Sequence, residues 1–277
     1  MTSKSKFEEE VASYRKLALA VRKEILDMIY RTRSPHVGSS FSIVEILIAL
    51  YFKILSIDPQ NPRWCGRDRF ILSKGHGCPA LYAVLFYRNL LTREVLAGFA
   101  VDGGTLEHHP RRDVDIGIEV STGSLGHGLS IGAGMALAAK HDDAAYRVFV
   151  LLGDGETNEG DVWESVMFAA HHNLDNLVAI VDYNKIQALG RTREVLDLDP
   201  LADKWHSFGW AVREVNGHSF EEILAAFEGI PFREGRPSVV IAHTIKGKGV
   251  SFMEDRLLWH YRCPDEQEYA RALKELA

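Results

Sequence analysis

Apolar residues recur along the chain in two patterns, and each pattern predicts a different element. Near the N-terminus they follow the period of about 3.6 residues that is typical of an amphipathic helix. This predicts a helix over residues 7–33, whose apolar positions are Val11, Leu17, Val21, Ile25, Met28 and Ile29. Ser34-Pro35 ends it, because a residue that precedes proline is pushed out of helical geometry. A second helix is predicted from an N-cap at Ser42 to Leu55, with Glu45 at the capping-box position.

The second pattern is a short run that is apolar throughout. Such runs occupy residues 70–72, 148–152, 177–181, 211–215 and 238–242. Helical patterns separate them, at 130–140 and 161–172 among others, residues 98–128 are expected to form a long loop, and a last helix is expected over 266–276. Apolar strands that alternate with helices are typical of a parallel sheet covered on both faces. The predicted fold class is α/β, a three-layer α/β/α arrangement with a mostly parallel sheet, in one domain over residues 1–277.

Four of these strands are followed by polar, glycine-bearing or lysine-bearing segments. They read SKGHG at 73–77, GDGE at 153–156, DYNK at 182–185 and HTIKGKG at 243–249. In open α/β sheets, ligands bind at the carboxyl ends of the strands. The sequence therefore predicts a ligand site where these four segments meet.

Composition narrows the class of ligand. The chain has 277 residues, 46% of them hydrophobic, and a net charge of -6, so it lacks the overall positive charge that favours nucleic-acid binding. No apolar run reaches the length of about 18 residues that would predict a membrane span. The first ten residues, MTSKSKFEEE, hold no apolar stretch of a signal peptide. Cys65, Cys78 and Cys263 form no CxxC pair and indicate free thiols in a reducing cytoplasm.

Asp154 and Asn184 carry the clearest chemistry. They follow neighbouring apolar strands 30 positions apart, which leaves room for one crossover helix between them. Their oxygens suit a hard divalent cation such as Mg²⁺ or Ca²⁺, and Mg²⁺ commonly shares its ligands with phosphate groups. The flanking glycines let the backbone approach a phosphate closely. The simpler alternative is that GDG forms a tight turn and Asn184 belongs to a loop, but the two motifs together favour a metal–diphosphate site.

Several segments resemble one enzyme family. LLGDGETNEG and LVAIVDYNKI together resemble the thiamine diphosphate motif, in which GDG is followed by an asparagine. Other segments match the loops of transketolases in the same order, namely SPHVGSS, RDRFILSKGHG, LEHHP, VSTGSLGHG, TIKGKG and a final WH. The chain therefore resembles transketolase from about residue 10 to residue 264, which implies the diphosphate-binding (PP) domain fold.

The resemblance implies a role for particular residues. Asp154, Asn184 and the Ile186 carbonyl would hold the metal, with Mg²⁺ first and Ca²⁺ or Mn²⁺ as alternatives. The remaining residues implied in cofactor binding are Ser39, His76, Gly123, Ser124, Leu125, Gly155, Glu156, Lys246 and His260. Gly155 and His260 would lie at the diphosphate, and residues 123–125 would line the aminopyrimidine ring.

Histidines form the expected catalytic group. His36, His76, His109 and His260 would contact the sugar hydroxyls, since imidazole exchanges protons near neutral pH. His108 is an alternative to His109, and His127 stands where the family more often has glutamine. Glu159 and Glu164 would face a second subunit, or would simply stabilise a helix N-terminus.

The resemblance also implies a partner. In the family, a pyrimidine-binding domain supplies the glutamate that activates the aminopyrimidine, and no residue here matches it. We therefore expect the N-terminal subunit of a split transketolase, active in an α2β2 assembly with a separate chain carrying that domain. The complex would transfer a two-carbon ketol unit from a ketose phosphate to an aldose phosphate, in the pentose phosphate route or in a specialised sugar pathway.

Three other functions are weighed against this one. The α subunit of a thiamine-dependent 2-oxo acid dehydrogenase E1 is also split, but the loops SPHVG and LEHHP argue against it. A nicotinamide-linked reductase is disfavoured because TGSLGHG is one residue short of its TGxxxGxG loop and follows no clear strand. A non-catalytic relative would have no need to retain both Asp154 and Asn184.

Overall fold

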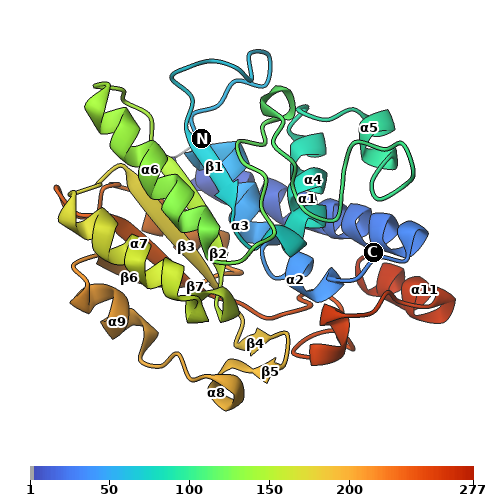
Figure 1. Cartoon of the computed structure of the whole chain (residues 1–277). Helices are drawn as coiled ribbons and strands as arrows, with labels where there is room; N and C mark the ends of the chain where they lie inside the picture. The colour runs from blue at the N-terminus through green and yellow to red at the C-terminus, as the bar shows by residue number, and fades with distance from the viewer. Residues whose placement is uncertain (1–2) are drawn as a thin grey trace.

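The computed structural model describes residues 3–277, as helices around a central sheet (Figure 1). The strands are β1 Arg69–Leu72, β2 Val148–Gly153, β3 Leu177–Tyr183, β4 Ile186–Gln187, β5 Gly190–Arg191, β6 Ala211–Asn216 and β7 Ser238–His243. The α-helices are α1 Ser3–Thr32, α2 Val37–Phe41, α3 Val44–Ala49, α4 Cys78–Tyr87, α5 Arg93–Ala97, α6 His127–His141, α7 Gly160–His171, α8 Thr192–Val195, α9 Leu201–Ser207, α10 Phe220–Phe227 and α11 Glu266–Glu275. All five predicted strands form within a residue or two of the expected bounds.

The main sheet has the order β1-β2-β3-β7-β6, and every neighbouring pair is parallel. Every residue of β2 and β3 is buried, as the uninterrupted apolar runs predict for strands covered on both faces. The register pairs Gly153 with Asp182, and Tyr183 with His243. Asp154, Asn184 and Thr244 therefore follow at the same edge of the sheet.

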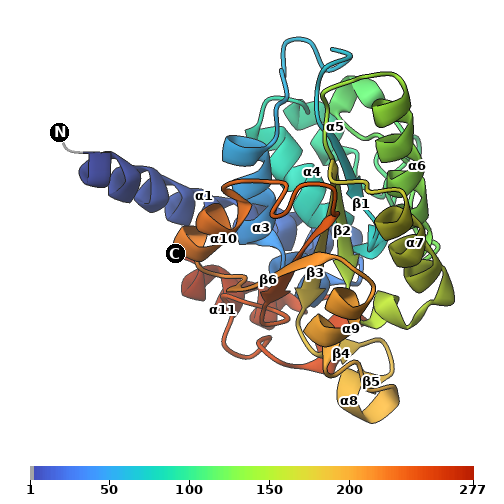
Figure 2. The ribbon, with the colours of Figure 1, turned by 90° about the vertical axis from the view of Figure 1, so that its left-hand side faces the viewer.

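Two hydrophobic cores lie on the two faces of this sheet. Phe149 and Leu151 of β2 point into the first core, together with residues of α1, α3, α4 and α10. Val148, Val150 and Leu152 point the other way, into the second core with α6, α7 and α9. This alternation along one strand produces the three layers that Figure 2 shows, with helices on both sides of the strands. The α/β/α prediction is confirmed.

The second predicted helix is differently built, and its predicted cap is wrong. Ser42 ends α2, and its hydroxyl donates a hydrogen bond of 2.8 Å to Asp182. Glu45 is 6% exposed and forms an ion pair of 2.7 Å with Arg22. These buried, charge-assisted contacts outcompete the local capping box that the sequence pattern suggested. After α3, a π-helical turn, η1 Leu50–Ile54, completes the apolar run.

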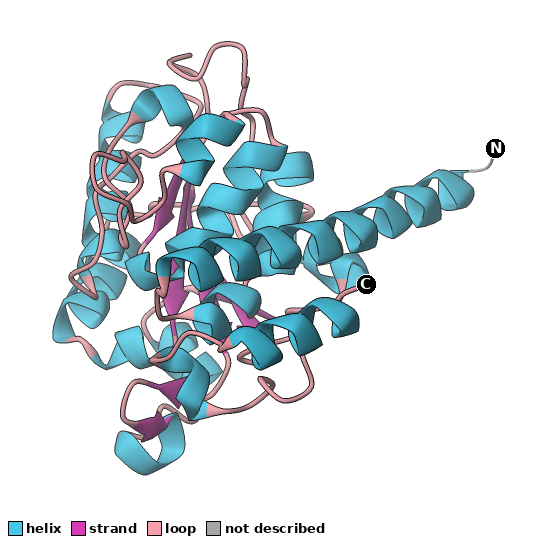
Figure 3. Ribbon diagram, turned by 90° about the vertical axis from the view of Figure 1, so that its right-hand side faces the viewer, coloured by secondary structure: helices cyan, strands magenta, loops and turns pink. Residues whose placement is uncertain are grey.

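Two features were not predicted. β4 and β5 form a short antiparallel hairpin directly after Asn184, and α8 follows it at the lower edge of Figure 1. The N-terminal turns of α1 extend away from the other elements (Figure 3). Among residues 3–277, no helix is both long and apolar enough to span a membrane.

Candidate cofactor site

A cavity of about 340 Å³ opens at the carboxyl ends of β1, β2, β3 and β7. Its lining includes thirteen residues predicted to bind the cofactor, the metal or the sugar, which are His36, Ser39, His76, His109, Gly123, Leu125, Asp154, Gly155, Glu156, Asn184, Ile186, Lys246 and His260. The four strand-end segments thus meet at one site, as the sheet topology predicts. Unpredicted residues also line the cavity, among them Lys74, Asn158 and Gln187.

Asp154 and Asn184 stand side by side at the floor of the cavity. The Asp154 carboxylate accepts backbone hydrogen bonds from Gly155 at 2.7 Å and from Lys185 at 2.5 Å. Asn184 Nδ2 donates to Asp182 at 2.9 Å, which leaves Asn184 Oδ1 on the other side, where it accepts from the Ile186 backbone at 3.1 Å. Burial, and then the nearby Asp182 carboxylate, raise the pKa of Asp154 to about 7.

Asp182 is a site residue that sequence reasoning missed. It is fully buried and accepts hydrogen bonds from Lys74 Nζ at 2.5 Å, from Ser42, from Asn184 and from Thr244. Burial alone would raise its pKa, but the Lys74 ammonium and these donors lower it. The available indication was an acidic residue directly after the apolar run at 177–181, at the start of the segment DYNK. Asp182 therefore orients the Asn184 amide from below the cavity.

Three histidines converge from distant parts of the chain. The ring centroids of His36 and His76 are 5.1 Å apart, those of His36 and His260 are 5.1 Å apart, and those of His76 and His260 are 5.5 Å apart. His36 precedes α2, with a φ of 75°, and its backbone N–H donates to the His260 carbonyl at 3.2 Å. Ser39 Oγ lies 3.4 Å from His260 Nδ1. The structure thus brings together three of the four histidines that are predicted to contact the sugar.

The site keeps these imidazoles neutral at pH 7. Burial, helped by neighbouring His109 and the lysines, lowers the pKa of His36 to about 4. Burial and Lys246 lower the pKa of His260 to about 3, and burial and Lys74 lower that of His76 well below its usual value. A neutral imidazole both donates and accepts hydrogen bonds, which suits contact with hydroxyl groups.

His109 lines the same cavity as these three histidines. A Cβ at Gly123 would lie 3.2 Å from its ring, and Gly123 has a φ of +151°, so this position favours glycine on both counts. The Tyr82 hydroxyl donates to the His109 carbonyl at 3.3 Å and fixes the loop. His108 is exposed and packs on Phe99. The structure therefore places His109, and not His108, in the cavity.

Three other predicted residues lie at the margin or outside. Ser124 is exposed and does not line the cavity, although its neighbours do. Glu159 is exposed at the rim, and Glu164 is exposed on α7, in a groove shared with α6. Glu156 lines the cavity, but its carboxylate accepts backbone hydrogen bonds from Gly126 at 2.9 Å and Gly153 at 3.0 Å.

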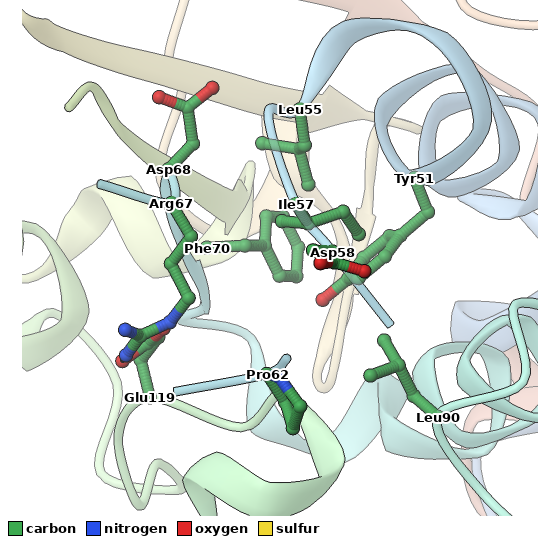
Figure 4. Close-up of a pocket in the computed structure, with 11 residues that line it drawn as sticks. Tyr51, Leu55, Ile57, Asp58, Pro62, Arg67, Asp68, Phe70, Leu90 and Glu119 are labelled. Atoms are coloured by element: carbon green, nitrogen blue, oxygen red, sulfur yellow. The ribbon is translucent and has the colours of Figure 1, made fainter. Parts of the chain in front are cut away.

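A second cavity lies at the opposite end of the sheet, beside the start of β1 (Figure 4). Its volume of about 20 Å³ suffices for about one water molecule. Arg67 and Glu119 form a buried, two-bond ion pair in its wall, with both N–O distances at 2.8 Å. The hydroxyl of Tyr51 points into it and has no hydrogen-bond partner among the described residues. This cavity is too small for a cofactor.

The donor set of the large cavity fits a hard divalent cation. Within residues 3–277, no three His, Cys, Asp or Glu side chains cluster as a metal site by themselves. Asp154, Asn184 and the Ile186 carbonyl supply one carboxylate, one amide and one backbone oxygen, all at the cavity. Oxygen ligands of this kind suit Mg²⁺, Ca²⁺ or Mn²⁺, and a phosphate group would supply further oxygens.

Comparison with known proteins identifies the class. Residues 13–275 match the family described as transketolase, thiamine diphosphate binding domain. An apulose-4-phosphate transketolase subunit of Phocaeicola vulgatus is 44% identical, with 92% of this chain and 91% of that protein covered. The 6-deoxy-6-sulfo-D-fructose transketolase subunit SqwG of Clostridium sp. is 44% identical, with 94% of each covered. The crystallised transketolase of Leishmania mexicana gives a TM-score of 0.88 at 28% identity, over 95% of this chain and 41% of that one.

The chain belongs to the transketolase family, and it corresponds to the family's thiamine diphosphate-binding domain. The resemblance seen in the sequence motifs, to the N-terminal subunit of a split transketolase, is confirmed. Thiamine diphosphate is the cofactor of this domain. The chain spans about two-fifths of the length of the solved transketolases it matches, whereas its subunit relatives have nearly its own length. Because these relatives are named as subunits, they imply a partner chain.

Proposed function

We propose that this chain is the cofactor-binding subunit of a split transketolase that transfers a two-carbon ketol unit from a ketose phosphate to an aldose phosphate. The observation that carries the proposal is the meeting of Asp154, Asn184, Ile186 and the histidine cluster in one cavity. Thiamine diphosphate, when bound, supplies the carbanion chemistry that such a transfer needs. The chain's own residues supply binding and placement.

The floor of the cavity would hold a divalent metal and the diphosphate. Asp154, Asn184 and the Ile186 carbonyl would be the metal ligands, with Mg²⁺ as the first choice. Gly155 lines the cavity, where the diphosphate would meet its backbone, and a side chain does not fit at this position, since a Cβ there would lie 2.5 Å from the Gln187 Cβ. Lys246, which is 2% exposed, brings a buried positive charge for the phosphate oxygens.

The histidine cluster would bind and orient the sugar. His36, His76, His109 and His260 line one cavity, and their lowered pKa values keep them neutral. Neutral rings can exchange a proton with a hydroxyl of the substrate without holding a fixed positive charge beside the cofactor. The substrate class is inferred from the relatives, which are named for a phosphorylated and a sulfonated sugar. We infer an anionic sugar as the substrate.

A separate chain with a pyrimidine-binding domain would close the cavity, in an α2β2 complex. The exposed face of α6 and α7 favours contact with another subunit, because Met167 is 50% exposed and Phe168 is 40% exposed there. Glu164 lies in the groove between α6 and α7, and Glu159, directly before α7, lies at the cavity rim. The three unpaired cysteines favour a cytoplasmic location.

The test is a tagged pull-down from the native cells, followed by a ketol-transfer assay with thiamine diphosphate and Mg²⁺. We expect a pyrimidine-domain chain to co-purify, and transfer to occur only in the complex. Reconstitution with His76→Asn should retain cofactor binding better than Asp154→Ala, while both lose transfer. Turnover of pyruvate with a dye acceptor would favour the 2-oxo acid dehydrogenase alternative. Full-rate transfer by the single chain would contradict the split enzyme.

A further inference from the structure

Lys246 makes an unexpected contact in the cofactor cavity. Its Nζ donates a hydrogen bond of 2.9 Å to the carbonyl oxygen of Ile186. That oxygen is also one of the three metal ligands in the function proposed above. Lys246 lies in the loop after β7, and Ile186 begins β4, so the contact joins two separate segments. An ammonium group thus bonds the oxygen to which a metal ion would bind.

Other charges around this contact explain why a cation belongs there. The Asp154 and Asp182 carboxylates both attract the Lys246 ammonium, and Lys74 pairs with Asp182 at 2.5 Å. All four side chains are at most 3% exposed, so their charges are poorly screened by water. Among the described residues the Asp154 carboxylate accepts hydrogen bonds only from backbone N–H groups, so Lys246 acts on it through charge and not through a hydrogen bond.

A divalent ion alone would gain little from this site. The chain offers it three oxygens, whereas Mg²⁺ prefers six ligands in octahedral geometry. The ion would also have to displace one ammonium group and lie near a second, that of Lys74. The diphosphate removes both obstacles to metal binding. It adds oxygen ligands for the ion, and it gives the displaced ammonium group a new anionic partner.

We propose that Lys246 serves as a stand-in cation on the Ile186 carbonyl and exchanges that oxygen for the diphosphate when metal and cofactor bind. The inference rests on the metal site proposed above. Its consequence is strong coupling, in which each ligand raises the affinity for the other by the same factor. Lys246 is then the residue that makes the chain select the metal–cofactor pair over the metal alone.

The test measures Mn²⁺ binding to the full chain by electron paramagnetic resonance, with and without thiamine diphosphate. Lys246→Met removes the ammonium and keeps the length of the side chain. Lys248→Met is the matched control, since Lys248 lies in the same loop, is 34% exposed in its side chain and pairs with Glu254. Lys246→Met should bind Mn²⁺ alone about tenfold more tightly than the unchanged chain, and lose about tenfold of the enhancement by thiamine diphosphate. Lys248→Met should change neither value.

The outcomes separate the inference from the proposal beneath it. Thermal melting first confirms that each variant is folded, and Lys246→Gln, which keeps a polar side chain, replaces Lys246→Met if the latter is not. Mn²⁺ affinity that is unchanged or weaker in the folded variant without thiamine diphosphate overturns the role of Lys246. Failure of the unchanged chain to bind Mn²⁺ even with thiamine diphosphate would instead overturn the metal site itself.

Discussion

The two ends of the sheet bury charges for different purposes. At the amino end of β1, Glu119 accepts two hydrogen bonds from the Arg67 guanidinium, and only a cavity of about 20 Å³ is left. At the carboxyl end, Asp154 has backbone donors and faces a cavity of about 340 Å³. A buried carboxylate with its own guanidinium is part of the fold. Asp154 is a buried carboxylate without such a partner, and its pKa is raised to about 7. Its ionised form is therefore unfavourable in the chain alone, and a bound cation would stabilise it.

The largest effect is expected at the carboxyl end, from Asp154→Asn. The change removes a metal ligand, so the affinity for thiamine diphosphate in Mg²⁺ should fall about a thousandfold, or about 4 kcal/mol. The free energy of unfolding of the cofactor-free chain should not fall by more than about 1 kcal/mol, because the change removes an unfavourable buried charge and costs at most one backbone hydrogen bond. Calorimetry and urea unfolding measure the two values, with the exposed Asp142→Asn as the control. A large loss of stability would mean that Asp154, like Glu119, is needed for the fold, and would contradict the difference between the two ends of the sheet.

Glu119→Gln should have the opposite profile. It leaves the buried Arg67 guanidinium without a counter-charge, so the free energy of unfolding should fall by about 3 kcal/mol. Asp115→Asn is the matched control, because its ion pair with Arg63 is 59% and 70% exposed in the two side chains and is screened by water, so its loss should change stability little. Urea unfolding gives both values. Cofactor affinity of the folded Glu119→Gln protein should be unchanged.

The pH dependence of stability tests the carboxyl end of the sheet through its buried histidines. His36 has a pKa of about 4 when folded, mainly because it is buried, against about 6.5 in an unfolded chain. Between these values the unfolded state binds the proton and the native state does not, so stability falls as the pH falls from 6.5 toward 4. His36→Asn should lose about 2 kcal/mol less between pH 7 and pH 4.5 than the unchanged chain. Asparagine is chosen because the φ of 75° suits it. Parallel pH curves would contradict the shift.

Tyr51→Phe should have the smallest effect. It removes a buried hydroxyl that no described residue binds, so stability should stay level or rise by up to about 1 kcal/mol. Thermal melting is sufficient to detect this. A loss of more than about 1 kcal/mol would mean that a water molecule in the small cavity bonds the hydroxyl, and that this end of the sheet is also a binding site, although for water only.

The sequence predicted the fold well where the pattern of apolar residues along a segment is simple. β2 and β3 are continuous apolar runs, and the polar segments after them could only gather at one edge of a parallel sheet. Prediction failed where a polar residue has a distant partner. Ser42 and Glu45 match a local capping box, but they bond Asp182 and Arg22, which come from other elements. The hairpin of β4 and β5 is too short for any periodicity to show.

For the candidate site too, residues in local motifs were predicted and residues that depend on distant partners were missed. Those in glycine-bearing loops after strands were predicted, whereas Lys74 and Asp182 were missed because their importance depends on each other. Ser124 shows the reverse case, since it lies between two lining residues but faces solvent. A motif identifies a segment, and only the packing around it decides which of its side chains enter the cavity.

The histidine cluster contains residues from segments that are far apart in the sequence. This separation determines when the site can form during synthesis. Ser39 and His260, which lie 221 positions apart, come within 3.4 Å of each other. Tyr30 of α1 stacks on Tyr269 of α11 at 4.1 Å, so the last helix holds the first. A ribosome releases the N-terminal half long before the segment that completes the pocket. During synthesis the sheet can assemble first, but the cofactor cannot bind in the complete pocket until the segment that carries His260 has also left the ribosome.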